Sequence, residues 1–152
     1  MKKVHFIVVG VCVLVLLPVP FDTELVPEWR LKVVGGNGTT LSNITVEESW
    51  EHYAYPESRF PTAKGYELKR SDENGVVVFP KRMLRASIGS RIVFPILARV
   101  GQLAHGSAGL DINARVFDEV NNYFSNSEDM IFWYSDQDGT KPLPNTIIAT
   151  PS

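Results

Sequence analysis

Cysteine is almost absent from this sequence, and disulfide chemistry is absent with it. Among 152 residues the single cysteine is Cys12, which lies within an apolar run near the start of the chain. A lipid-modified cysteine would follow a small residue, whereas Cys12 follows Val11, so we interpret it as an apolar filler. Beyond that run, the sequence offers no disulfide to stabilise the fold and no thiol to act as a nucleophile.

The chain also lacks a strong excess of charge. Its formal net charge is −2 at pH 7, from 15 basic and 17 acidic side chains. This balance is typical of a soluble protein and argues against broad binding to nucleic acid. The distribution is uneven, because residues 69–103 hold seven basic and two acidic side chains between two acidic segments. The middle of the chain is therefore expected to form a positive region.

Motifs of metal-dependent or nucleophilic catalysis are missing as well. His52 and His105 are the histidines outside the apolar run, and neither belongs to an HExxH motif. The stretch HGSAG at residues 105–109 lacks the Gly-x-Ser-x-Gly elbow of serine hydrolases, and the turn at residues 136–139 lacks the later glutamate of a calcium loop. We therefore predict no catalytic residue, no metal site and no cofactor, and a protein that is not an enzyme.

What the sequence does contain begins with a long apolar run. Lys2 and Lys3 precede residues 4–19, in which His5 is the one polar interruption. A basic start followed by an apolar stretch is the layout of a secretory signal. We expect residues 1–21 to be a signal peptide or an N-terminal membrane anchor; no small-x-small cleavage pattern decides between them, and the run is shorter than the roughly 20 residues that cross a bilayer comfortably. The chain is expected to be exported.

The rest of the chain is dominated by alternation of apolar and polar side chains, which predicts β-strands. The pattern is clear in Trp29, Leu31 and Val33, which are separated by charged residues. The dipeptide Asn74-Gly75 suits a tight turn and predicts an antiparallel hairpin between the segments on either side. In all we predict six or seven strands, over residues 29–33, 44–53, 66–70, 76–79, 110–117, 130–134 and 146–149.

One segment departs from this pattern and predicts an amphipathic helix over about residues 87–103. Ser87 can cap its start, and Pro95 is expected to kink it or to divide it into two short helices. Its apolar side comprises Ile88, Ile92, Val93, Ile96, Leu97, Val100 and Leu103. Its polar side comprises Ser87, Ser90, Arg91, Arg99 and Gln102. We expect the apolar side to cover one end or face of the strands, with the arginines pointing outward; contact with a membrane surface is the alternative.

Two turns and the strands around them carry a family resemblance. Its residues are Asn37, Gly38, Leu41, Ile44 and Val46, and then Asp72, Asn74, Gly75, Val78 and Phe79. This order resembles the carboxypeptidase regulatory-like domains, which are transthyretin-like β-sandwiches of exported bacterial proteins, and it covers about residues 28–80. The resemblance implies an all-β, transthyretin-like antiparallel β-sandwich over residues 28–150 with the helix as an insertion. It implies an accessory role more than a reaction.

We therefore predict a non-enzymatic exported binding or structural module of the cell envelope, in the periplasm or at the cell surface. Its partner would be a protein or a glycan and not a nucleic acid, with membrane attachment through the N-terminal segment as a further option. The candidate contact residues are Tyr53, Tyr55, Arg85, Arg91 and Arg99.

Two alternatives stay open. One is a carbohydrate-binding module that stacks sugar rings on Tyr53 and Tyr55, with nearby Trp50 assigned to the core. The other is a weak metal-dependent enzyme. Its ligands would come from His52, His105, Glu48, Glu51 and Asp111.

Overall fold

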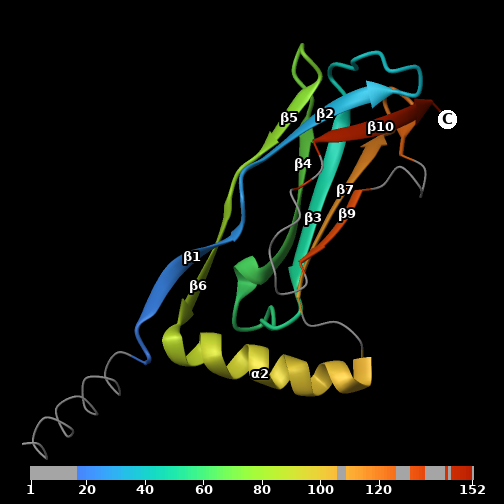
Figure 1. The fold of residues 1–152 in the computed structure, drawn as a ribbon. Helices are drawn as coiled ribbons and strands as arrows, with labels where there is room; N and C mark the ends of the chain where they lie inside the picture. Colours follow the sequence, from blue (N-terminus) through green and yellow to red (C-terminus); the bar gives the residue numbers. More distant parts are fainter. Residues whose placement is uncertain (1–16, 106–108, 126–130, 136–142, 144, 152) are drawn as a thin grey trace, which may run out of the picture.

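The computed structural model describes residues 17–105, 109–125, 131–135, 143 and 145–151 (Figure 1). Its strands are β1 (Pro20–Val26), β2 (Trp29–Gly35), β3 (Thr45–His52), β4 (Lys64–Arg70), β5 (Val76–Phe79), β6 (Arg82–Ser87), β7 (Leu110–Asp118), β8 (Tyr123–Phe124), β9 (Ile131–Ser135) and β10 (Thr146–Pro151). Its helices are the short 3₁₀-helix η1 (Pro61–Ala63) and the α-helix α2 (Ile88–His105). The predicted all-β fold with one amphipathic helix is confirmed, although β1, β6 and β8 come in addition to the predicted strands.

Eight strands form one sheet that curves into a sandwich approaching a barrel. The strand order is β4-β3-β7-β8-β10-β2-β5, and β9 also pairs with β7. All pairs are antiparallel except β2 and β10, which run parallel. The predicted alternation holds in β2, where Trp29, Leu31 and Val33 are buried and the lysine and arginine between them are exposed. Inward side chains of β2, β5 and β10 therefore meet those of β3 and β7 in the main core.

The predicted hairpin between β4 and β5 is wrong. The turn does form, since Gly75 adopts a φ of +70° and the carboxylate of Asp72 accepts hydrogen bonds from the backbone amides of Asn74 and Val76. However, β4 pairs with β3, whereas β5 pairs with β2. The turn therefore crosses from one side of the sandwich to the other instead of joining two hydrogen-bonded neighbours. Turn residues specify the local reversal of the chain but not which strands pair beyond it.

A two-stranded arm extends from the sandwich. β1 and β6 pair antiparallel with each other and belong to no larger sheet; β1 leads into β2, and β6 continues from β5 (Figure 1). β1 begins at Pro20, so the ordered β-structure starts before the predicted domain boundary at residue 28. The arm has a small core of its own. It consists of Ala54, Tyr55, Phe60, Ala63, Leu84 and Ala86, with Leu25, Phe94 and Ala98 packed against it.

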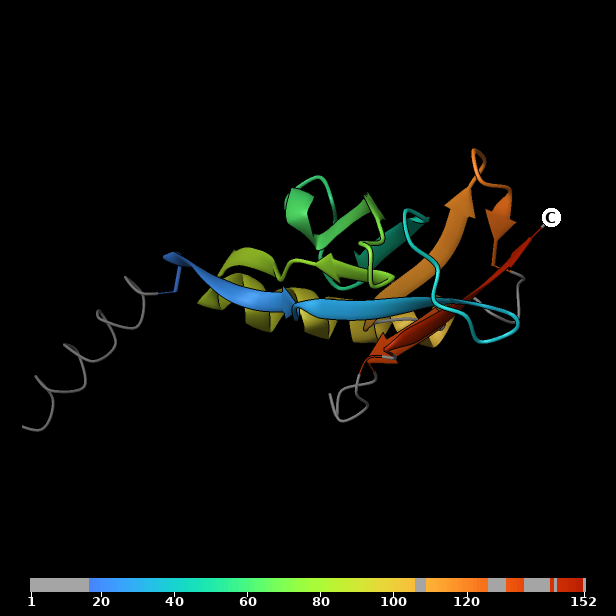
Figure 2. The same cartoon turned by 90° about the horizontal axis from the view of Figure 1, so that it is seen from above.

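Helix α2 follows directly from the arm and lies across the end of the sandwich (Figures 1 and 2). Ser87 caps it, because the Ser87 hydroxyl oxygen accepts a hydrogen bond from the backbone amide of Ser90 at 3.2 Å. The helix continues through Pro95 to His105, close to the predicted bounds of 87–103. Within the described residues, no helix is long and apolar enough to cross a bilayer.

The predicted orientation of α2 is wrong. Its inner side presents Arg91, Phe94 and Ala98 to the arm, whereas the predicted core-facing side chains, such as Ile92 and Ile96, are exposed. On this inner side, Arg91 donates hydrogen bonds to backbone carbonyls of the arm, while Phe94 and Ala98 pack against its small core. The periodicity of a helix specifies which residues share a side, but it does not specify which side meets the sheet.

Several sequence features fall outside the described residues. These are Cys12, most of the apolar run at residues 4–19, most of HGSAG and the turn at residues 136–139.

Candidate binding groove

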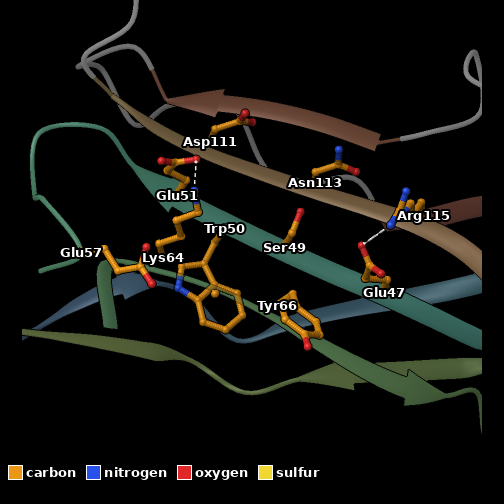
Figure 3. A pocket seen from close by; sticks show the side chains of 11 residues that line it. Glu47, Ser49, Trp50, Glu51, Glu57, Lys64, Tyr66, Asp111, Asn113 and Arg115 are labelled. Atoms are coloured by element: carbon orange, nitrogen blue, oxygen red, sulfur yellow. Dashed lines mark hydrogen bonds and ion pairs between the residues drawn. The ribbon is translucent and has the colours of Figure 1, made fainter. Parts of the chain in front are cut away.

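An open groove of about 660 Å³ lies on the outer surface of β3, β4 and β7 (Figure 3). β3 is the central strand, because it pairs with β4 on one side and with β7 on the other. The groove is lined by Glu47, Ser49, Trp50, Glu51, Glu57, Lys64, Gly65, Tyr66, Asp111, Asn113 and Arg115. Most of these residues point outward, because side chains alternate between the two faces of the sheet along each strand. The backbone of the sheet therefore fixes their positions.

Two aromatic side chains give the groove an apolar surface. Trp50 belongs to the inward-facing series of β3 and packs against the main core, yet its indole also reaches the groove past Gly65 of β4. A Cβ atom at Gly65 would lie 2.6 Å from Cζ2 of Trp50, so only glycine leaves room for the ring. Tyr66 follows on β4 and is 72% exposed. The prediction that Trp50 belongs to the core therefore captures one part of its role.

The Trp50 ring is held in place from three directions. Its Nε1 atom donates a hydrogen bond to the carbonyl oxygen of Thr62 at 3.1 Å. The guanidinium carbon of Arg82 lies 4.2 Å from the ring centroid, a cation–π contact. Gly65 supports the ring from β4. A ring held this firmly loses little conformational entropy when a ligand stacks on it.

The polar border of the groove consists mostly of charged side chains in pairs (Figure 3). Lys64 Nζ lies 3.2 Å from Glu51 Oε2, and Arg115 Nη2 lies 2.8 Å from Glu47 Oε1. Burial, together with the charge of Glu51, raises the pKa of Asp111 above its ordinary value. These groups offer several hydrogen-bond acceptors and donors within one concave surface.

Of the predicted contact residues, Tyr53 is partly exposed beside the groove. Burial and the negative charge of Asp111 raise the pKa of Tyr53. Tyr55, in contrast, is buried, which contradicts its predicted place at the surface. Its ring centroid lies 4.7 Å from that of His52 and 5.2 Å from that of Phe60, both in edge-to-face contact. Tyr53 and Tyr55 therefore do not form an aromatic platform.

The predicted arginines have different environments. Arg91 is turned inward, and its guanidinium donates hydrogen bonds to Thr23 Oγ1 at 2.6 Å and to the carbonyl oxygens of Phe21 and Leu84 at 2.9 and 3.0 Å. Its donors are therefore engaged within the arm, and its role as a partner contact stays a prediction. Arg85 and Arg99 are exposed, as predicted.

A second hollow, of about 340 Å³, lies between α2 and the arm. It brings together three of the predicted contact residues, Tyr55, Arg91 and Arg99, while Tyr53 and Arg85 lie elsewhere. His52 also borders it; burial lowers the pKa of His52, and its Nδ1 atom accepts a hydrogen bond from the backbone amide of Ala54 at 3.2 Å. The hollow is bordered mainly by groups that already have partners within the protein.

Sequence reasoning missed a buried ionic cluster behind the groove. Glu48 is completely buried, and its Oε2 atom lies 2.7 Å from Nη2 of Arg82. The same guanidinium group also pairs with Glu67 of β4. Burial raises the pKa of Glu48 more than the neighbouring Arg82 lowers it. One signal was available, since Glu48 interrupts an otherwise apolar, inward-facing series on β3.

The described side chains of the metal-site alternative lie in different places, and the side chain of His105 is outside the described residues. Among the residues that the structure describes, no group of three or more histidine, cysteine, aspartate or glutamate side chains is arranged to hold a metal ion. Glu48 is paired with Arg82, His52 faces the second hollow, and Glu51 and Asp111 border the groove.

Comparison with known proteins does not place the chain in a family. No family model matches it, and neither does a curated protein or a solved structure. The function is therefore inferred from the groove and from the fold that positions it.

Proposed function

We propose that the protein is a non-enzymatic binding module of the cell envelope that contacts another macromolecule through this groove. The single observation that carries the proposal is the aromatic surface formed by half-buried Trp50 and exposed Tyr66 within a polar border. Both basic groups at that border, Lys64 and Arg115, are already paired with carboxylates, which suits recognition by shape and hydrogen bonding. The apolar run at residues 4–19 supports export to the periplasm or the cell surface.

The aromatic surface favours a glycan as the ligand. The apolar face of a sugar ring stacks on an aromatic ring, while its hydroxyl groups need donors and acceptors around the stack. The groove combines Trp50 and Tyr66 with carboxylates, the amide of Asn113 and the hydroxyl group of Ser49. Its volume of about 660 Å³ falls within the range of roughly 300–1,000 Å³ typical of small-ligand sites. The carbohydrate-binding alternative therefore still depends on stacking of sugar rings, but on Trp50 and Tyr66 instead of Tyr53 and Tyr55.

The resemblance to carboxypeptidase regulatory-like domains belongs to the same proposal. An antiparallel sandwich with an accessory binding role is what that resemblance implies. The arm formed by β1 and β6, which precedes and follows the matched region, goes beyond it.

The proposal is tested by measuring glycan binding to the purified protein and to two variants. Tyr66→Ala removes half of the aromatic surface from an exposed position, so stability should change little. We expect about tenfold weaker binding, because loss of a stacking contact worth about 1 kcal/mol and of its buried area corresponds to roughly one decade in affinity.

Leu68→Ala is the matched control. Leu68 lies two residues further along β4 on the same side, is 51% exposed and does not line the groove. Its replacement should leave glycan binding unchanged. A glycan array without any bound sugar, or an equal loss in both variants, would contradict a glycan ligand in this groove.

A further inference from the structure

Helix α2 has a continuous apolar stripe on the side that faces away from the sandwich. Its members are Ile88, Ile92, Val93, Ile96, Leu97 and Val100, and their exposed fractions range from 39% to 64%. They span about 18 Å along the helix, at 1.5 Å per residue. An exposed apolar surface of this kind marks a site of interaction in a folded protein.

The sandwich leaves this stripe uncovered because the opposite side of α2 makes the contacts of the fold. Phe94 packs in edge-to-face contact with Phe60, with ring centroids 5.2 Å apart. Ala98 packs against the same small core, and Arg91 donates hydrogen bonds to the arm. These contacts attach α2 to the arm, so the fold does not require the apolar stripe to be buried.

The apolar run of the sequence reaches the described structure beside this stripe. The backbone amide of Gly89 donates a hydrogen bond to the carbonyl oxygen of Leu17 at 3.0 Å. Leu17 and Pro18 line a hollow of about 800 Å³ together with Val93 and Leu97 of the stripe. A segment that enters a membrane and ends at Leu17 would thus bring the first turns of α2 to the membrane surface.

The charged groups of α2 itself are of one sign, whereas Asp22 and Glu24 are exposed on the neighbouring strand β1. α2 contains Arg91 and Arg99 but no aspartate or glutamate. Arg59 borders the hollow beside the stripe, with its guanidinium carbon 5.7 Å from the centroid of the Phe94 ring. Arg85 is exposed on β6, which leads into α2. Arg59, Arg85 and Arg99 are available to anionic headgroups, whereas the guanidinium of Arg91 is engaged by the arm.

We propose that α2 lies flat on an anionic bilayer surface, with its apolar stripe among the acyl chains and the sandwich held above the membrane. The proposal rests on the placement of the protein in the cell envelope, but not on the ligand of the groove. A second copy is a poorer occupant of the stripe, because two such helices would bring arginines together without any acidic residue on α2 to pair with them.

The test uses the full chain in mixed phosphatidylcholine–phosphatidylglycerol vesicles. In a Cys12→Ser background, Leu97→Cys and Val100→Cys each carry one environment-sensitive fluorophore on the stripe. Leu68→Cys carries the same label on the sandwich, where the exposed fraction of Leu68 is similar to that of Leu97. Because all three positions are exposed, labelling should not unfold the protein.

We expect the labels at positions 97 and 100 to show a blue-shifted emission and to lose intensity when lipids carry a doxyl quencher on their acyl chains. The label at position 68 should show neither change. Emission typical of water at positions 97 and 100 of vesicle-bound protein would overturn the proposal for α2 alone. A blue shift without quenching by lipid would also overturn it, because residues 1–16 or a second copy would then cover the stripe. A full chain that does not bind vesicles at all would refute the placement at a membrane as well.

Discussion

Replacement of Arg82 by methionine tests the buried ionic cluster, which links the arm to the groove. Arg82 pairs with Glu48 at 2.7 Å and also with Glu67, and it lies over the ring of Trp50. Arg82→Met keeps an unbranched apolar stem but leaves the completely buried carboxylate of Glu48 without its cation. The variant therefore isolates a buried charge in the interior of the sandwich.

The expected loss of unfolding free energy follows from the burial of the Glu48 carboxylate. Removing one partner of a buried ion pair costs about 3–5 kcal/mol of unfolding free energy. The Arg82 side chain is 17% exposed, and this partial access to water places the expectation near the lower limit, about 3 kcal/mol. A small domain has a total stability of about 5–15 kcal/mol, so the loss should be large. The double variant Glu48→Leu/Arg82→Met should regain most of it, because two apolar side chains carry no charge to desolvate.

Urea unfolding followed by far-ultraviolet circular dichroism measures these differences. Arg85→Met on the same strand is the control; because Arg85 is exposed, the change should stay within about 0.5 kcal/mol. A loss below about 1 kcal/mol in Arg82→Met, or a double variant as unstable as the single one, would show that Arg82 does not stabilise the buried charge of Glu48.

The pH dependence provides an independent measurement of the same variant. Burial raises the pKa of Glu48 in the folded protein above its ordinary value of 4.5. An acid whose pKa is raised by folding stabilises the folded state in its protonated form, and this contribution is lost as the pH rises through the raised value. The deficit of Arg82→Met should therefore shrink on acidification, because protonated Glu48 needs no cation.

Three further changes test other parts of the fold by thermal or urea unfolding. Gly75→Ala should cost about 2–4 kcal/mol, since φ is +70° there and a Cβ atom would lie 2.3 Å from Cγ2 of Thr40; an unchanged midpoint would contradict this. The ionised carboxylate of Asp118 contributes to the free energy of unfolding above its ordinary pKa of 3.8, and this contribution is lost as the pH falls through the lower pKa of the folded protein. Asp118→Asn should remove it. Although burial acts in the opposite direction, the hydrogen bond from the backbone amide of Thr45 and its other donors lower that pKa, so an equally steep acid transition in the variant would refute the assignment. Phe94→Ala should cost about 2 kcal/mol, because the ring is only partly buried against the arm; a loss below about 0.5 kcal/mol would mean that α2 is not held by this contact.

Strand content and the helix could be predicted from the sequence because both depend on local periodicity. Alternation in Trp29, Leu31 and Val33 is visible in the sequence and has the predicted burial in β2. The helix was predicted from Ser87 and the apolar spacing after it, and it forms over Ile88–His105. β1 and β6 were missed, because prolines interrupt the pattern around β1 and the arm buries few side chains.

The candidate groove could not be predicted in the same way. Trp50 reaches it only because Gly65 lies opposite on β4, and that pairing is a register between distant segments. Tyr55 was predicted to be exposed, but residues from the 3₁₀ region and from α2 cover it. A pattern of side chains along one segment contains no information about which segment will pack on it.

The sequence by itself thus determined the all-β character, the position of the helix, the turns and the apolar run, since each depends on neighbours within a few residues. Only the tertiary structure decided that β4 and β5 separate, that Arg82 joins Glu48 and Glu67, and that α2 turns Arg91 inward and its isoleucines outward. The physical reason is that a buried carboxylate such as Glu48 must find a donor, and its donor Arg82 comes from a segment far away in the chain.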